Sequence, residues 1–249
     1  MFYQSVDYSQ YILTKKEKMI GWLIGAGIAS VTMFIFFRVL ILSIVLGIAG
    51  GFIALPFYRK ALLKKRKRIL LLQFSEMLSS LANSFSSGCN IYEAYTEVYH
   101  DMCQQFLPSA MISKEIETIV LGLQNNITID VLLKDFANRS NLLDIENFVS
   151  TFSVAVRLGG DLKKVITQTR NLIGAKIDIS MDIEVSIAEK KGELNMLMVM
   201  PLVVVMMISM LGSHEVVANT PVNIIVKVIA ILLFGSAYWL GQRIINIKF

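Results

Sequence analysis

Four apolar stretches, each of 18 or 19 residues, limit what this chain can fold into more than any other feature. They cover residues 19–37, 39–57, 194–211 and 222–240. A helix needs about 20 apolar residues to cross the hydrocarbon core of a bilayer. Because 55% of the residues are hydrophobic and the mean hydropathy is +0.60, the composition is not that of a water-soluble domain. The sequence therefore predicts four transmembrane helices.

Basic residues mark one end of every predicted span. Lysines precede the first span, a dense basic run follows the second, Lys190 and Lys191 precede the third, and Arg243 follows the fourth. By the positive-inside rule these ends face the cytoplasm. Only Arg38 separates the first two stretches, and a single helix over 19–57 would be about 58 Å long. We therefore expect two spans joined there by a tight turn.

This topology predicts five segments, with both termini in the cytoplasm. They are an N-terminal cytoplasmic segment, a transmembrane hairpin, a cytoplasmic domain, a second pair of transmembrane helices and a short cytoplasmic tail, over 1–18, 19–57, 58–193, 194–241 and 242–249 respectively. Residues 69–193 carry 10 Lys and Arg against 16 Asp and Glu. A nucleic-acid-binding face is usually basic, so no nucleic-acid partner is expected.

The cytoplasmic domain reads as entirely helical, because its apolar residues recur every three or four positions. The predicted fold class is thus all-α, with a helical bundle carried by the spans. We expect a chain break at Pro108 and a last helix of more than 30 residues that continues to the third span. The inward face of that helix is predicted to include Ile166, Leu172 and Ile173.

Capping residues predict where individual helices begin and end. Gly88 suits the C-terminal cap of one helix, and Asn90 with Glu93 forms a capping box for the next. Ser113 and Thr128 are predicted to start two further helices.

The segment LGGD interrupts strongly helical sequence and has two interpretations, a phosphate loop or a helix corner. A phosphate loop follows a strand and carries a pattern such as GxGxxG or GK[ST], neither of which occurs here. Gly159 and Gly160 can adopt positive φ and end one helix, and Asp161 is a good N-cap for the next. We therefore predict a helix corner.

Seven basic residues form one dense run after the second span. This run has three interpretations: a topology determinant, a binding site for anionic lipid, or a contact for an acidic partner. Its members are Arg59, Lys60, Lys64, Lys65, Arg66, Lys67 and Arg68.

No residue pattern indicates catalysis or metal binding. The cysteines, Cys89 and Cys103, and the histidines, His100 and His214, lack metal-ligand spacing, and no nucleophile, base and acid are arranged as a triad. The many carboxylates of the domain fit solvated faces and helix caps. We expect no enzymatic activity, no cofactor and no metal.

Two segments resemble the type II secretion F domain. QFSEMLSSLANSFSSGCNIYEAY is similar to its first half, with a helix, a glycine turn and a second helix. LLKDFANRSNLLDIENFVSTFSVAVRLGGDLKKVITQTRNLI is similar to its second half, and the whole domain would cover about 70–187. Secretion and type IV pilus platform proteins usually carry two copies and a GE pair at the corner. One copy with GG resembles the B and C type platform proteins of the tight-adherence (Flp) pilus, and the sequence does not choose between B and C.

This resemblance implies a non-enzymatic platform protein in the cytoplasmic membrane of a prokaryote. The implied partners are a hexameric secretion ATPase, a homologous F-domain platform protein, pilin subunits and membrane lipid. Contact with the ATPase is expected at the basic run and at the exposed faces around Gly88 and 159–161. Two other functions fit the residues alone: a small membrane transporter, or a membrane-tethered adaptor. A transporter would need polar residues that converge inside the spans. Lys227 is a candidate, but it lies one to two turns into the fourth span, where snorkelling toward the loop side is the favoured interpretation.

Overall fold

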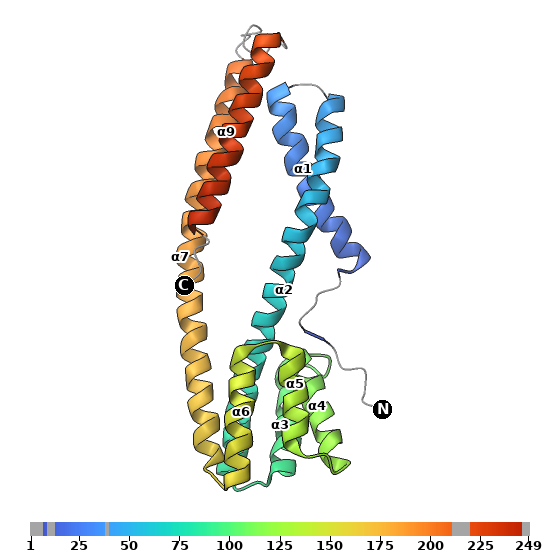
Figure 1. Cartoon of the computed structure of the whole chain (residues 1–249), viewed down its shortest axis with the longest axis vertical. Coiled ribbons are helices and arrows are strands. Elements are labelled where there is room, and N and C mark those ends of the chain that lie inside the picture. Colours follow the sequence, from blue (N-terminus) through green and yellow to red (C-terminus); the bar gives the residue numbers. More distant parts are fainter. Residues whose placement is uncertain (1–6, 9–12, 38–39, 211–219, 246–249) are drawn as a thin grey trace. The chain divides into compact units, whose positions relative to one another are not determined.

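The computed structural model describes residues 7–8, 13–37, 40–210 and 220–245 (Figure 1). Within these ranges the chain forms eight helices and no strand, so the predicted all-α fold is confirmed. The expected turn at Arg38 lies outside the described residues. The helices are α1 (Lys15–Phe37), α2 (Leu40–Ser86), α3 (Ile91–Phe106), α4 (Met111–Gln124), α5 (Ile129–Ser140), α6 (Leu143–Leu158), α7 (Leu162–Met210) and α9 (Pro221–Ile245).

Four of these helices, α1, α2, α7 and α9, are long and apolar enough to cross a membrane. The chain is therefore an all-α polytopic membrane protein. At 47 and 49 residues, α2 and α7 are about 70 Å long, so only part of each fits in a bilayer. The expected last helix of the domain and the third span are one continuous helix, and neither Gly174 nor Pro201 ends it.

The chain divides into two compact units. The first comprises Met1–Ile12 and Lys60–Ile179, and the second comprises Leu13–Arg59 and Ser180–Phe249. Both α2 and α7 run without a break from one unit into the other. The first unit holds the helical bundle, and the second holds most of the apolar spanning sequence.

Small residues allow α1 and α2 to approach closely within the second unit. A Cβ atom added to Gly50 would lie 2.6 Å from the Cβ atom of Ala29. One added to Gly51 would lie 2.7 Å from the Trp22 ring and 2.9 Å from the Trp22 carbonyl oxygen. Glycine at these positions lets the two backbones pack together, as small residues do between membrane helices.

Gly51→Ala is expected to destabilise the α1–α2 hairpin by about 1–3 kcal/mol, because a backbone carbonyl cannot move aside for the added methyl group. Thermal unfolding in detergent micelles, followed by tryptophan fluorescence, measures this change. Gly27→Ala is the matched control, since a Cβ atom there would meet nothing within 4 Å. Equal stability of the two variants would contradict the packing described.

Aromatic residues from three helices form the centre of the bundle. Phe74 of α2 lies edge-on to Phe148 of α6, with ring centroids 5.4 Å apart, and 6.1 Å from Phe136 of α5. All three side chains are buried, together with Met77, Leu78 and other residues of the predicted inward faces. The apolar faces that the 3.6-residue period predicts for the separate helices thus pack together in one core.

The predicted inward face of α7 is wrong at one residue. Ile166 and Ile173 are buried, but Leu172 is 72% exposed. Ile166 and Ile173 are seven residues, or almost two full turns, apart and so lie on the same side of the helix. Leu172 lies about 100° around the axis from Ile173 and faces another direction. The apolar character of Leu172 is therefore not a sign of burial.

Candidate functional site

The corner between α2 and α3 is built around Gly88, whose φ is 86°. The N–H of Gly88 donates to the carbonyl of Phe85 at 3.2 Å, and the N–H of Cys89 donates to the carbonyl of Ser84 at 3.2 Å. These two bonds satisfy carbonyls at the end of α2 in the Schellman pattern. A left-handed φ carries little steric penalty only for glycine.

The start of α3 carries a complete capping box. The Asn90 side-chain oxygen accepts from the N–H of Glu93 at 2.9 Å, and the Glu93 carboxylate accepts from the N–H of Asn90 at 3.1 Å. Thr128 is the N-cap of α5 by position, without a side-chain cap hydrogen bond. The prediction for Ser113 is wrong: the N-cap of α4 is Ala110, three residues earlier, and the buried Ser113 hydroxyl donates to the Leu107 carbonyl at 3.0 Å.

The two glycines at the corner between α6 and α7 have different conformations. Gly159 has φ 70° and ψ 30°, the left-handed conformation, whereas Gly160 does not have a positive φ. The N–H of Gly160 donates to the carbonyl of Ala155 at 2.8 Å. Asp161 accepts from the N–H of Lys164 at 3.0 Å and caps α7. Only one of the two glycines thus uses the conformational freedom expected of both.

Gly159→Ala is expected to cost about 1–2 kcal/mol of bundle stability, because an L-residue is strained in the left-handed region. Gly160→Ala is expected to change stability by less than about 0.5 kcal/mol, since its Cβ atom would meet Ala155 at an ordinary 3.4 Å. Chemical denaturation of both full-length variants gives the comparison. Equal losses would show that the corner requires glycine at both positions.

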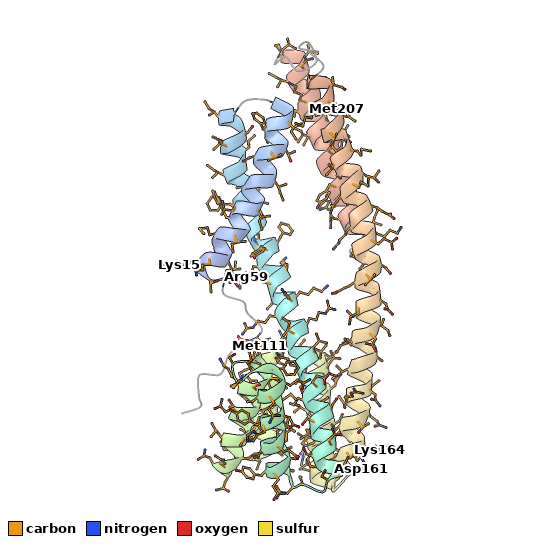
Figure 2. The ribbon with its side chains drawn as sticks, turned by 180° about the vertical axis from the view of Figure 1, so that it is seen from behind. Lys15, Arg59, Met111, Asp161, Lys164 and Met207 are labelled. Carbon is orange, nitrogen blue, oxygen red and sulfur yellow. The ribbon has the colours of Figure 1, made fainter. Side chains whose placement is uncertain are left out.

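Both corners lie at the same end of the bundle (Figure 1). The hydrogen bond from Arg170 near the start of α7 to Ser79 near the end of α2, at 3.0 Å, fits this arrangement. In Figure 2, Asp161 and Lys164 lie at this end, and Met111 lies toward the opposite end of the bundle. The faces around Gly88 and Asp161 are exposed.

The seven residues of the basic run do not share one environment. Arg59, Lys60, Lys64 and Lys65 are exposed, whereas Arg66, Lys67 and Arg68 are half-buried. Lys67 donates to the carbonyl of Asn141, the C-cap of α5, at 3.0 Å. The guanidinium of Arg66 lies 4.9 Å from the centroid of the Tyr8 ring. Of the seven residues, the four exposed ones therefore remain candidates for contact with lipid or a partner protein, and they lie nearest the second apolar stretch.

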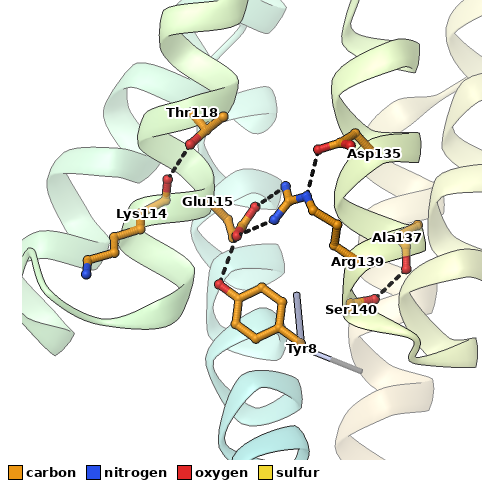
Figure 3. A network of polar contacts seen from close by, with 8 residues as sticks. All are labelled: Tyr8, Lys114, Glu115, Thr118, Asp135, Ala137, Arg139 and Ser140. Atoms are coloured by element: carbon orange, nitrogen blue, oxygen red, sulfur yellow. Dashed lines mark hydrogen bonds and ion pairs between the residues drawn. The ribbon is translucent and has the colours of Figure 1, made fainter. Parts of the chain in front are cut away.

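Sequence reasoning missed a polar network at Glu115 (Figure 3). The Tyr8 phenol donates to Glu115 Oε1 at 2.8 Å. Arg139 donates to both carboxylate oxygens of Glu115, at 2.7 Å and 2.6 Å, and through Nε to Asp135 at 2.7 Å. The N–H of Tyr8 donates to the carbonyl of Arg139 at 2.9 Å. Tyr8 is 2% exposed and Glu115 is 4% exposed, so this is a buried network.

Electrostatics keep both donors of this network protonated. Burial raises the pKa of the Tyr8 phenol, and the charge and hydrogen bond of Glu115 raise it further. Burial acts to lower the pKa of the Arg139 guanidinium, but the hydrogen bonds and charges of Glu115 and Asp135 outweigh it and hold that pKa above its ordinary value. The phenol therefore remains a donor and the guanidinium a cation at neutral pH.

The remaining polar groups form no recognisable reactive arrangement within the described part of the chain. No three of its His, Cys, Asp and Glu residues lie close enough together to hold a metal ion. Glu76 and Asp101 line an open cavity of about 440 Å³ along α2 and α3, where Ser80 donates to Asp101 at 2.5 Å. Cys89 and Cys103 are free thiols, and His214 lies outside the described residues.

Comparisons of the chain with protein-family models, with curated proteins and with solved structures find no match.

Proposed function

We propose that this chain is a platform protein of a type II secretion-like or tight-adherence (Flp) pilus assembly machine. It acts without catalysing a reaction itself, in the cytoplasmic membrane of a prokaryote. It couples a cytoplasmic hexameric secretion ATPase to the extraction of pilin subunits from the bilayer. As a protein with one F domain, it pairs with a homologous platform protein.

The main support is the way the bundle is connected to the spans. The bundle is inserted between two pairs of apolar helices, and both connections are unbroken helix, through α2 and α7. A helix keeps every interior backbone group hydrogen-bonded, whereas a flexible linker would absorb motion. A force applied to the bundle would thus pass to the spans along two helices.

The bundle is also fastened to α7 by side chains. Lys176 forms an ion pair with Asp144 of α6 at 2.7 Å, and Ile166 and Ile173 are buried in the core. A displacement of α6 is therefore expected to carry the first part of α7 with it. This is the property that a platform driven by a partner ATPase requires.

Exposed basic residues supply the surface for the partner. Lys60 and Lys65 are exposed on α2, shortly after the apolar stretch that ends at residue 57. Such residues bind anionic lipid headgroups with about 1 kcal/mol each, and they equally suit an acidic protein face.

Binding of the secretion ATPase to the full-length protein in lipid nanodiscs tests the proposal. We expect the chain alone to show no ATP hydrolysis, and the ATPase to bind it. Lys60→Gln with Lys65→Gln is expected to weaken binding about tenfold, whereas Lys114→Gln with Lys134→Gln, equal in charge and exposed on α4 and α5, is expected to leave it unchanged. ATP hydrolysis by the purified chain, or absence of ATPase binding, would contradict the proposal.

A further inference from the structure

The bundle binds a residue that precedes the first span. Tyr8 belongs to the same unit as the bundle, although only six residues separate it from Lys15, the first residue of α1 in the other unit. Its phenol, its ring and its backbone N–H are each recognised by a different group: Glu115, Arg66 and the Arg139 carbonyl. Three contacts of different chemistry on one residue make a specific site.

The site is assembled from three helices of the bundle. Arg66 comes from α2, Glu115 from α4 and Arg139 from α5. Tyr8 is only 2% exposed, and its hydroxyl donates to the Glu115 carboxylate, which also forms an ion pair with Arg139. Hydrogen bonds to charged groups are among the stronger ones in proteins, and a guanidinium over a tyrosine ring adds a cation–π attraction.

The site does not depend on Tyr8 for its own integrity. Arg139 holds both oxygens of Glu115 and one oxygen of Asp135, so all of these charges keep partners when the phenol leaves. An ion pair that remains intact leaves no buried charge uncompensated. Loss of Tyr8 from the site should therefore leave the bundle folded.

We propose that the bundle carries a tyrosine-binding site formed by Arg66, Glu115 and Arg139, and that Tyr8 fills this site in cis as a releasable latch. This inference does not rest on the proposed function. The occupant of the site is this chain's own Tyr8.

Hydrogen–deuterium exchange of the full-length protein in lipid nanodiscs tests the latch. The backbone amide of residue 8 is bonded to the Arg139 carbonyl. We expect it to exchange at least about tenfold more slowly in the wild type than in Tyr8→Ala, because the alanine lacks the side-chain contacts that hold this residue in the site. Tyr8→Phe, which keeps the ring and loses the phenol, is expected to lie between them. Tyr92→Phe is the matched control, since the Tyr92 hydroxyl also has a hydrogen bond but is on the exposed surface of α3.

The exchange of the core separates the possible outcomes. The latch predicts that α6 amides near Phe148 and Phe152 exchange equally slowly in wild type and in Tyr8→Ala, while the amide of residue 8 loses its protection in Tyr8→Ala. Unchanged exchange of the residue 8 amide in Tyr8→Ala would show that the site does not bind the Tyr8 side chain. Faster exchange throughout α6 would show that Tyr8 is a structural part of the core and not a releasable latch.

Discussion

Glu115→Ala is expected to lower the free energy of unfolding of the bundle by about 3–5 kcal/mol. The side chain of its partner Arg139 is only 13% exposed, so removal of the carboxylate leaves a cation largely out of water that has lost its two hydrogen bonds to Glu115. The free energy can be measured from the slowest-exchanging amides of the bundle in the full-length protein.

Two further variants separate the ion pair from other effects. Glu117→Ala, an exposed carboxylate on the same helix, is expected to change stability by no more than about 0.5 kcal/mol. Glu115→Leu combined with Arg139→Leu is expected to recover most of the loss, because both buried charges are removed and Asp135, whose side chain is 55% exposed, is solvated by water. If Glu115→Ala were as stable as Glu117→Ala, the network would not be buried as described.

Phe74→Ala is expected to destabilise the bundle by about 3–5 kcal/mol, since it removes a fully buried ring that contacts Phe136 and Phe148. This is a large share of the 5–15 kcal/mol typical of a folded domain. Phe74→Leu fills most of the space and is expected to cost about 1.5 kcal/mol or less.

The stability of the Phe74 variants is likewise measured from the slowest-exchanging amides of the bundle in the full-length protein. Val154→Ala on the exposed side of α6 is the surface control and should change stability by no more than about 0.5 kcal/mol. If Phe74→Ala lowered the free energy of unfolding no more than Val154→Ala does, Phe74 would not be part of the core.

The features that could be predicted from the sequence are those governed by local interactions. The apolar spans, the helical period and the Asn90–Glu93 capping box each depend on residues within a few turns of one another, and the structure contains them. Ser113 misled the prediction because the same residue type caps helices and fills buried sites, and its hydroxyl bonds to a carbonyl of the preceding segment. Leu172 misled it because apolar residues also occur on exposed faces.

The polar network at Glu115 could not be predicted, because its members are distant in sequence. Tyr8 and Glu115 are 107 residues apart, and Glu115 and Arg139 are 24 apart. Each residue taken alone fits an ordinary exposed position, and Arg139 has a plausible local partner in Asp135 at i,i+4. The division of the basic run into exposed residues and residues that bind Tyr8 and Asn141 likewise follows from packing.

The central claim is that this chain is a platform contacted by a secretion ATPase. Photoreactive residues at the exposed positions 65, 90 and 163, with position 134 on α5 as control, test it in cells that make the filament. Captured partners are identified by mass spectrometry. We predict capture of a secretion ATPase, together with an F-domain protein as the proposed partner, from at least one of the three test positions and not from the control. Capture of neither partner, while the filament is being made, would contradict the claim.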